Sequence, residues 1–219
     1  MTYEIIASGS TGNAVLLDGG TLVDIGVPYK RLKPYIKDIR LVLLTHQHGD
    51  HFNAATARTL HKERPAVRWG CGQWMVPLLL DAGIDQRVID VLDLGKRHSW
   101  RDYKGQHLMV IPQAVPHDVP NLAYSMVFPS GETVFFCTDC STLEGITAQG
   151  FDLYMIEANH SREEIDARIE AKRAAGEYAY EVQARRNHLS QEQALDWLSE
   201  QMGPESKYMF LHQHKAKEK

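Results

Sequence analysis

The sequence lacks the features of a membrane protein and of a disulfide-rich secreted protein. No apolar run approaches the ~20 residues that a membrane-spanning helix needs, and the chain opens without the basic segment of a signal peptide. It has three cysteines, Cys71, Cys137 and Cys140, which is an odd number. Cys137 and Cys140 have the spacing of a redox or zinc pair, but a zinc knuckle would need a second pair. We therefore expect a cytoplasmic protein with reduced thiols and no membrane partner.

The sequence also lacks an excess of positive charge. Its 24 Lys and Arg residues stand against 28 Asp and Glu residues, which gives a formal net charge of −4. This argues against a protein that coats nucleic acid non-specifically, because such a protein needs a basic field. It does not argue against a metal-dependent nuclease, because metal ions and a local patch can hold a polyanion. The length of 219 residues suits one domain, or two closely merged half-domains, with a substantial core, and we predict a single domain over 1–219.

Short apolar runs separated by turn residues predict many short strands with helices between them. Strands are expected over 3–7, 14–17, 21–24, 41–44, 67–69, 87–91, 107–111, 123–128, 133–136, 152–156 and 208–211. Helices are expected over 27–36, 54–60, 74–82, 161–175, 177–186 and 191–202, with Asn53 and Ser161 as N-caps and Ser190 with Gln193 as a capping box. The opening strands favour an antiparallel sheet. The loop from Gly9 to Gly12 lacks the Lys-Ser/Thr ending of a phosphate-binding P-loop, and a structural turn is the favoured interpretation.

One polar stretch, Thr45–His51, contains three histidines and one aspartate. It follows the apolar run Leu41–Leu44, and open α/β sheets place their chemistry at such strand ends. Imidazole and carboxylate are ligands that divalent metals prefer, Zn²⁺ above all. A His-x-His turn can direct two imidazoles at one ion, while Asp50 and His51 can face a second one. Gly49 is expected to supply the turn with conformational freedom.

Further ligand candidates stand at the ends of other predicted strands. His117 follows the strand over 107–111 through a proline-braced loop, Asp139 follows the strand over 133–136, and His212 follows the last strand. The full set of candidates is His46, His48, Asp50, His51, His117, Asp139 and His212. Because seven ligands exceed what one tetrahedral zinc can use, the sequence favours two ions.

The pattern His46-x-His48-x-Asp50-His51 resembles the signature of the metallo-β-lactamase fold superfamily. Other stretches resemble one branch, the bacterial exonucleases of this fold that are related to ribonuclease Z: Ala7–Ala14, Asp24–Gly26, Glu157–His160 and His188–Ser190. The matching motifs extend from about residue 4 to His212. The resemblance implies an α/β protein with the four-layer αββα sandwich of the metallo-β-lactamase type.

The resemblance also implies a ligand assignment. One metal would be held by His46, His48 and His117, the other by Asp50, His51 and His212, with Asp139 bridging the two. The β-lactam-hydrolysing members lack this bridging carboxylate, whereas phosphodiesterases and thioester hydrolases of the fold have it. The expected cofactors are two divalent ions, Zn²⁺ first and Mn²⁺ as an alternative. Two ions ~3.5–4 Å apart would convert a water into a hydroxide that attacks phosphorus in line.

The predicted catalytic residues are Asp50, His188 and Glu157. His188 is the candidate acid for the leaving oxygen, and Glu157 would orient it; a surface histidine at a helix start is the alternative for His188. Predicted substrate-binding residues are Ser10, Asn13, His188 and Ser190. Asp24 either orients a ligand histidine or caps a strand end. His61, His98 and His107 are interpreted as surface or structural histidines, and His160 is left unassigned.

The leading hypothesis is a dinuclear metal phosphodiesterase, and specifically an exonuclease, with a nucleic acid or nucleotide as its substrate. A cyclic-nucleotide phosphodiesterase fits the compact chain equally well in chemistry, and a thioester or lactone hydrolase comes third. Nothing between Asp139 and His188 resembles the long tRNA-gripping arm of ribonuclease Z, so tRNA end processing is not expected. Basic residues on the helix over 161–175 either line a phosphate track or form salt bridges. Homodimers are common among the relatives.

Overall fold

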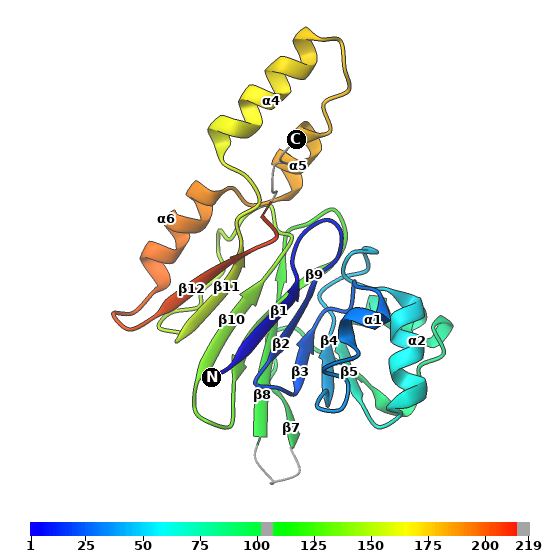
Figure 1. Ribbon diagram of the computed structural model, residues 1–219. Helices are drawn as coiled ribbons and strands as arrows, with labels where there is room; N and C mark the ends of the chain where they lie inside the picture. The colour runs from blue at the N-terminus through cyan, green and yellow to red at the C-terminus, as the bar shows by residue number, and fades with distance from the viewer. Residues whose placement is uncertain (102–106, 214–219) are drawn as a thin grey trace. The chain divides into compact units, whose positions relative to one another are not determined.

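The computed structural model describes residues 1–101 and 107–213. The chain divides into two compact units, Met1–His98 and Ser99–Lys219. Each unit is built on one six-stranded mixed sheet, and β7, at the edge of the second sheet, begins at His98 (Figure 1). The prediction of a single domain over 1–219 stays a prediction. Among the described residues, no helix is both long and apolar enough to cross a membrane.

The sheet of the first unit runs β1-β2-β3-β4-β5-β6 in chain order. Its strands are β1 (Tyr3–Ala7), β2 (Ala14–Leu17), β3 (Thr21–Val23), β4 (Leu41–Leu43), β5 (Arg68–Cys71) and β6 (Ile89–Val91). The first three pair in antiparallel fashion, as predicted, and β3 to β6 are parallel. Parallel strands put their carboxyl ends at one edge of the sheet, so the residues after β3 and after β4 lie side by side there.

Helices of the first unit cover its sheet and close an apolar core. They are α1 (Tyr29–Leu32), α2 (Ala54–Glu63), α3 (Val76–Asp81) and the 3₁₀ turns Gln73–Met75 and Gln86–Val88. The Asn53 side chain accepts from the backbone N–H of Thr56 at 3.0 Å, which confirms Asn53 as the N-cap of α2. Leu60 of α2 packs in one buried cluster with Trp69 of β5 and Val42 of β4.

The sheet of the second unit runs β12-β11-β10-β9-β8-β7. Its strands are β7 (His98–Arg101), β8 (His107–Val115), β9 (Asn121–Val127), β10 (Thr133–Cys137), β11 (Leu153–Glu157) and β12 (Lys207–Leu211). The strands β8, β9 and β10 are antiparallel neighbours, whereas β10, β11 and β12 are parallel. The carboxyl ends of β10, β11 and β12 therefore bring Asp139, Glu157 and His212 to one edge. Two differences from prediction are that β8 continues through Pro112 and that β7 was not expected.

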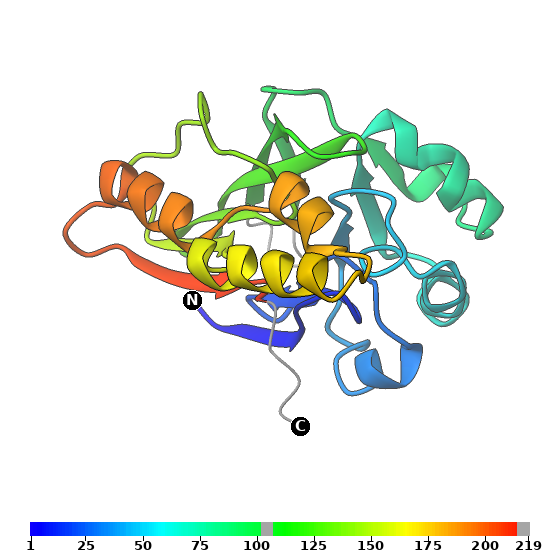
Figure 2. The same ribbon diagram turned by 90° about the horizontal axis from the view of Figure 1, so that it is seen from above.

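Three helices belong to the second unit: α4 (Arg162–Ala174), α5 (Glu181–Asn187) and α6 (Gln191–Gln201). Figures 1 and 2 show α6 alongside β11 and β12, with α4 and α5 beyond the ends of these strands. The Trp197 ring of α6 packs with Phe135 and Tyr154 at centroid distances of 5.2 and 5.9 Å. The Ser190–Gln193 capping box of α6 is confirmed.

The start of α4 differs from prediction. Ser161 occupies the N-cap position, but its side chain makes no capping hydrogen bond. The Glu192 carboxylate of α6 instead accepts from the backbone N–H of Arg162, at 3.2 and 3.3 Å from its two oxygens. A carboxylate at this place also suits the positive end of the helix dipole. The beginnings of α4 and α6 are therefore fastened together.

Candidate functional site

In the first unit, a buried carboxylate connects the ends of β3 and β4. Asp24, directly after β3, is 1% exposed and accepts from the backbone N–H of Thr45 at 2.9 Å. Its other oxygen lies 2.6 Å from Nδ1 of His51. This contact leaves Nε2 of His51 as the ring nitrogen that faces away from the carboxylate. Asp24 thus fills both roles that the sequence left open: it orients His51 and satisfies a strand-end N–H.

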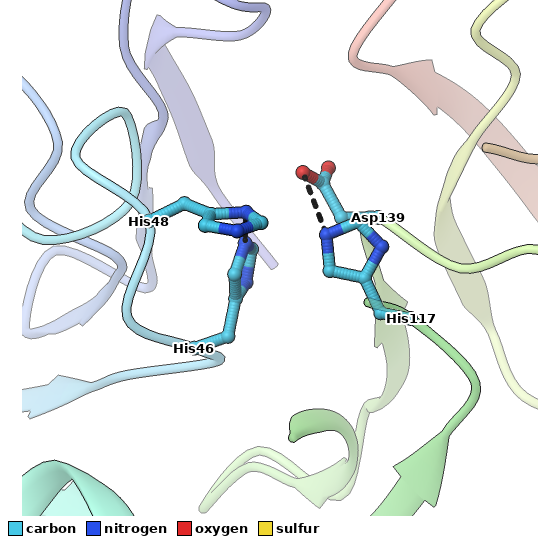
Figure 3. Close-up of side chains that lie close together, drawn as sticks. All are labelled: His46, His48, His117 and Asp139. Atoms are coloured by element: carbon cyan, nitrogen blue, oxygen red, sulfur yellow. Dashed lines mark hydrogen bonds and ion pairs between the residues drawn. The ribbon is translucent and has the colours of Figure 1, made fainter. Parts of the chain in front are cut away.

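His46 and His48 lie close together after β4. Nε2 of His46 is 3.1 Å from Nδ1 of His48 (Figure 3), and Nδ1 of His46 is 3.0 Å from the hydroxyl of Thr45. Two nitrogens that each bond one tetrahedral zinc at ~2.0–2.1 Å lie roughly 3.3–3.4 Å apart. The observed spacing of the two imidazoles therefore fits two ligands of a single ion.

Asn13 fastens the loop before β2 to the His51 segment. Its backbone N–H donates to the Asp50 carbonyl at 2.6 Å, and its side-chain nitrogen is 2.8 Å from Nε2 of His51. Its side-chain oxygen accepts from the Gly9 N–H at 2.8 Å. The Gly9–Gly12 stretch is accordingly a structural turn, with Gly12 N–H donating to the Gly9 carbonyl at 2.9 Å. The substrate-binding roles of Ser10, which is exposed, and of Asn13, which is buried, stay predictions.

Gly26, and not Gly49, is the glycine that the loop carrying Asp50 and His51 requires. A Cβ at Gly26 would lie 1.7 Å from the Asp50 carbonyl oxygen and 2.6 Å from the His51 nitrogen. A Cβ at Gly49 would meet nothing within 4 Å, and Gly49 does not have a positive φ. The expectation that Gly49 supplies turn freedom was therefore wrong. The close approach of two backbone segments fixes where Asp50 and His51 lie.

We expect Gly26→Ala to lower the free energy of unfolding by about 1–3 kcal/mol, because the Asp50–His51 backbone must move. Gly49→Ala is the matched control in the same loop and should change it by less than about 1 kcal/mol. Urea unfolding followed by circular dichroism measures both. Equal stabilities for the two variants would show that the contact at Gly26 is not constraining.

In the second unit, His117 is held in a neutral state. Its side chain is 1% exposed, Nδ1 lies 3.2 Å from the Asn187 carbonyl, and Nε2 lies 3.1 Å from Asp118. The dashed line in Figure 3 marks its longer contact of 4.0 Å with Asp139. Burial lowers the pKa of His117 below its ordinary value, although the two carboxylates work in the opposite direction. A neutral imidazole is the form that binds a metal.

Asp139 and His212 form a buried pair at the ends of β10 and β12. Nδ1 of His212 lies 2.8 Å from Asp139 and 2.9 Å from Glu157. Burial alone would lower the pKa of His212, but hydrogen bonds to these two carboxylates raise it to about 10. The pair of carboxylates therefore strongly favours a positive charge beside them. A divalent cation suits such a place, and this supports the fit of the site to a metal.

Glu157 connects His212 to His188. One oxygen, Oε1, is 2.6 Å from Nδ1 of His188 and also contacts His212, while Oε2 accepts from the backbone N–H groups of Cys140 and Leu189. Burial lowers the pKa of His188, but the hydrogen bond to Glu157 outweighs it, so the net shift is upward. The predicted Glu157–His188 contact is present. Asp139, Glu157, His188 and His212 each offer one ligand atom, and these atoms lie within 4.8 Å of one another.

Several residues that hold the site in place were not predicted from the sequence. Asn121, 1% exposed, donates to the carbonyls of Thr138 and Asp139 at 2.8 and 2.6 Å. Asn159 donates to the carbonyl of His212 at 3.0 Å. Nothing local marks Asn121, since its partners lie 17 and 18 residues along the chain. Asn159 lies in the stretch Glu157–His160, which resembles the exonuclease branch. Its place in that stretch was the signal that could have identified it from the sequence.

Other predicted residues have structural partners. Ser190 is buried, and its hydroxyl accepts from the Gln193 N–H as the cap of α6; its substrate-binding role stays a prediction. His61 accepts from the Asp85 N–H at 3.2 Å, and His98 accepts from the Asp93 N–H at 3.0 Å. Cys71, Cys137 and Cys140 are buried free thiols, with 3.6 Å between the sulfurs of Cys137 and Cys140.

Comparison with solved structures finds proteins whose fold is similar to that of this chain. Human tRNase Z, short form, aligns with a TM-score of 0.69 at 15% identity over 98% of this chain and 93% of that chain. The metallo-β-lactamase fold protein YhfI from Bacillus subtilis gives 0.64 at 12% identity over 96% and 85%. The long form RNase Z from yeast gives 0.64 at 11% identity, over 98% of this chain and 38% of the yeast chain. No curated protein matches the sequence.

A family model settles the assignment. The model described as "Beta-lactamase superfamily domain" matches residues 15–212, which is most of the chain. The predicted α/β sandwich of the metallo-β-lactamase type, with two mixed sheets flanked by helices, is confirmed. The histidine and carboxylate groups at the strand ends supply the ligand types that this enzyme class needs. The chain belongs to the beta-lactamase superfamily and is a metal-dependent hydrolase of the metallo-β-lactamase fold.

Proposed function

We propose that the protein is a dinuclear metal-dependent phosphodiesterase, and that it acts on nucleic acids as an exonuclease. The observation that carries the proposal is the Glu157–His188 contact of 2.6 Å. His188 lies outside the proposed ligand set and is held by the buried carboxylate of Glu157. Both residues belong to the same cluster as Asp139 and His212. A hydrolase that must protonate a poor leaving group, such as a nucleotide oxygen, needs such a residue.

The proposal keeps the ligand assignment that the resemblance implies. It assigns His46, His48 and His117 to one ion, Asp50, His51 and His212 to the other, and Asp139 to both. Support within the first unit is the 3.1 Å spacing of the His46 and His48 nitrogens and the orientation of His51 by Asp24. Support within the second unit is the neutral state of His117 and the preference of the Asp139–Glu157 pair for a positive charge.

When bound, two divalent ions would acidify a water molecule and neutralise charge on the phosphate oxygens. The side chains have separate tasks in this scheme. Asp24 fixes the ring of His51, and Asn121 fixes the backbone of Asp139. Glu157 hydrogen-bonds Nδ1 of His188, so Nε2 is the nitrogen that delivers a proton to the leaving oxygen. Asp50 is assigned two roles, as a metal ligand and as a catalytic residue.

A nucleic-acid substrate is favoured by the structural relatives, because two of them are named as tRNase Z and RNase Z. The sequence motifs quoted for the exonuclease branch point the same way. Zn²⁺ is the preferred ion by affinity, with Mn²⁺ as the alternative. A cytoplasmic location, a homodimer and substrate contacts from Ser10, Asn13, His188 and Ser190 stay predictions.

The test is a parallel turnover assay on protein loaded with Zn²⁺ or with Mn²⁺. Substrates are end-labelled single- and double-stranded DNA, RNA, cyclic mononucleotides, a thioester and a base-free phosphodiester ester. The proposal expects progressive shortening of polymers together with cleavage of the base-free ester. Fast opening of a cyclic nucleotide with inert polymers would instead establish the cyclic-nucleotide alternative. Hydrolysis of the thioester alone would overturn the phosphodiesterase proposal.

A further inference from the structure

His117, in the second unit, lies between a backbone carbonyl and two carboxylates. Its Nδ1 is 3.2 Å from the carbonyl oxygen of Asn187, while its Nε2 is 3.1 Å from Oδ1 of Asp118 and 4.0 Å from Oδ2 of Asp139. A carbonyl oxygen can only accept a hydrogen bond, so Nδ1 is the nitrogen that carries the proton of the neutral ring. Nε2 is then an acceptor, and its two neighbours are carboxylate oxygens, which are acceptors as well.

Three acceptors in this arrangement repel one another, so the arrangement favours a positive ion beside Nε2. The side chains of His117 and Asp139 are 1% and 3% exposed, and water therefore screens the repulsion only weakly. The metal that the proposed function assigns to His117 is such an ion. An ion bound to Nε2 at ~2.0–2.1 Å lies within ~5.2 Å of Oδ1 of Asp118. The Asp118 charge therefore acts on this ion, whether in direct contact or through one water molecule.

Asp118 differs from the buried groups around it because it is accessible. Its side chain is 43% exposed, so an ion or a water molecule reaches the carboxylate without any movement of the core. It directly follows His117 in the loop between β8 and β9. It is absent from the ligand assignment that the sequence motifs imply. A role for this carboxylate at the metal is therefore an addition to the proposed site.

Asn187, the last residue of α5, holds both His117 and Asp118. Its side-chain nitrogen donates to Oδ2 of Asp118 at 3.1 Å, and its carbonyl accepts from Nδ1 of His117. The three residues thus form a closed ring of contacts. An exposed carboxylate without such a partner would populate several rotamers, and each rotamer would place the charge at a different distance from the ion. The end of α5 therefore sets where this charge lies.

We propose that Asp118 is an additional residue of the metal site, that its charge stabilises the ion at His117, and that Asn187 positions it. The inference rests on the proposed function, because it takes His117 as a metal ligand. It does not depend on the identity of the substrate. It predicts that metal affinity falls when the charge of Asp118 is removed and when its contact with Asn187 is removed.

Zinc binding, measured by competition with a chromophoric chelator, tests the proposal without any substrate. Asp118→Asn preserves the size of the side chain and removes its charge, and we expect it to weaken one step of the titration about 10- to 100-fold. This should be the step that His117→Ala also weakens. Asp196→Asn is the matched control, because Asp196 is exposed on α6 and its substitution changes the net charge equally. The control should bind zinc as tightly as the wild type.

A double-mutant cycle tests the positioning role of Asn187. Asn187→Ala retains the backbone carbonyl that contacts His117 and removes only the side-chain contact with Asp118. It should weaken the same zinc-binding step about 3- to 10-fold, because a hydrogen bond to a charged group is lost. In the Asp118→Asn protein the same substitution should change zinc binding little, because the two residues act together. Gln183→Ala, at an exposed position one turn earlier on α5, is the control for effects on the helix.

The outcomes separate this inference from the proposed function. If His117→Ala weakens zinc binding and Asp118→Asn does not, the role of Asp118 is wrong while the ligand assignment stands. If His117→Ala leaves zinc binding unchanged, the ligand assignment itself fails. An effect of Asn187→Ala that is equally large in the Asp118→Asn protein would overturn the positioning role. Circular dichroism confirms that each variant is folded, and Asp118→Asn with its control suffices for the first test should Asn187→Ala not fold.

Discussion

Replacing Asp139 with asparagine is expected to reduce phosphodiester hydrolysis at least about 100-fold and to lower the bound-metal content. Mutation of residues that only support metal ligands typically changes activity 10–100-fold, so loss of the proposed bridging ligand should exceed that range. The carboxylate contacts His212 at 2.8 Å and Asp139 is 2% exposed, so solvent does not easily compensate for the loss of its negative charge. Mass spectrometry of the metal content and turnover of the base-free ester give the two readings.

The backbone at Asp139 decides which substitution is informative. Its φ is 53°, in the left-handed region that asparagine tolerates better than alanine. Asp139→Ala should lose activity and metal as well, but it adds backbone strain to the missing ligand. Asp18→Asn is the matched control, because Asp18 is exposed and has a φ of 47°. Full activity and full metal content in Asp139→Asn would remove Asp139 from the ligand set.

The sequence was sufficient to predict the strands with clear apolar patterns. Each of the stretches 3–7 and 14–17 is a strand with the predicted bounds. In contrast, β7 has the sequence His-Ser-Trp-Arg, which has no apolar pattern that predicts a strand. It forms because a neighbouring strand offers hydrogen bonds, and this is a tertiary effect that local periodicity does not record.

The geometry of the site was less predictable than its composition. Asp24, Asp139 and His212 all have positive φ, at 61°, 53° and 50°. Such conformations are unfavourable for residues other than glycine and are maintained by the surrounding structure. Asn121 and Asn159 provide part of that support, because they donate hydrogen bonds to the carbonyls of Asp139 and His212, far along the chain. The choice between the two roles of Asp24 also required the structure, since one carboxylate performs both.

The Glu157 contacts show where sequence reasoning was incomplete. The motif suggested a single partner, His188, and the structure adds His212 at 2.9 Å to the same oxygen. Glu157 is fully buried and its pKa lies below its ordinary value: burial raises it, but the hydrogen bonds to His188 and His212 outweigh that effect. A shared carboxylate makes the orientation of one histidine depend on the other. Mutations at Glu157 should therefore affect both proton delivery and metal binding.

Replacing His188 with alanine should retain the bound metals and lose turnover of nucleotide substrates by about 10²–10⁴-fold, the usual range for a general acid. The loss should depend on the leaving group. A p-nitrophenyl phosphodiester releases p-nitrophenolate, a stable anion that needs little protonation. Its cleavage should therefore fall much less than that of a dinucleotide. His107→Ala, at an exposed position at the start of β8, is the control and should change neither rate.

The leaving-group comparison separates proton donation from metal binding, which is the alternative that the structure raises. His188 belongs to a group with Asp139, Glu157 and His212 whose ligand atoms lie within 4.8 Å of one another, so it has the geometry of a ligand as well. If His188 binds a metal, His188→Ala should lower the metal content and slow both substrates equally. Retained metal with a loss confined to the poor leaving group assigns His188 to the proton. Glu157→Gln should then show the same dependence on the leaving group in weaker form, because it leaves the imidazole in place without its orienting carboxylate. It should also lower the metal content, because Glu157 contacts His212 as well.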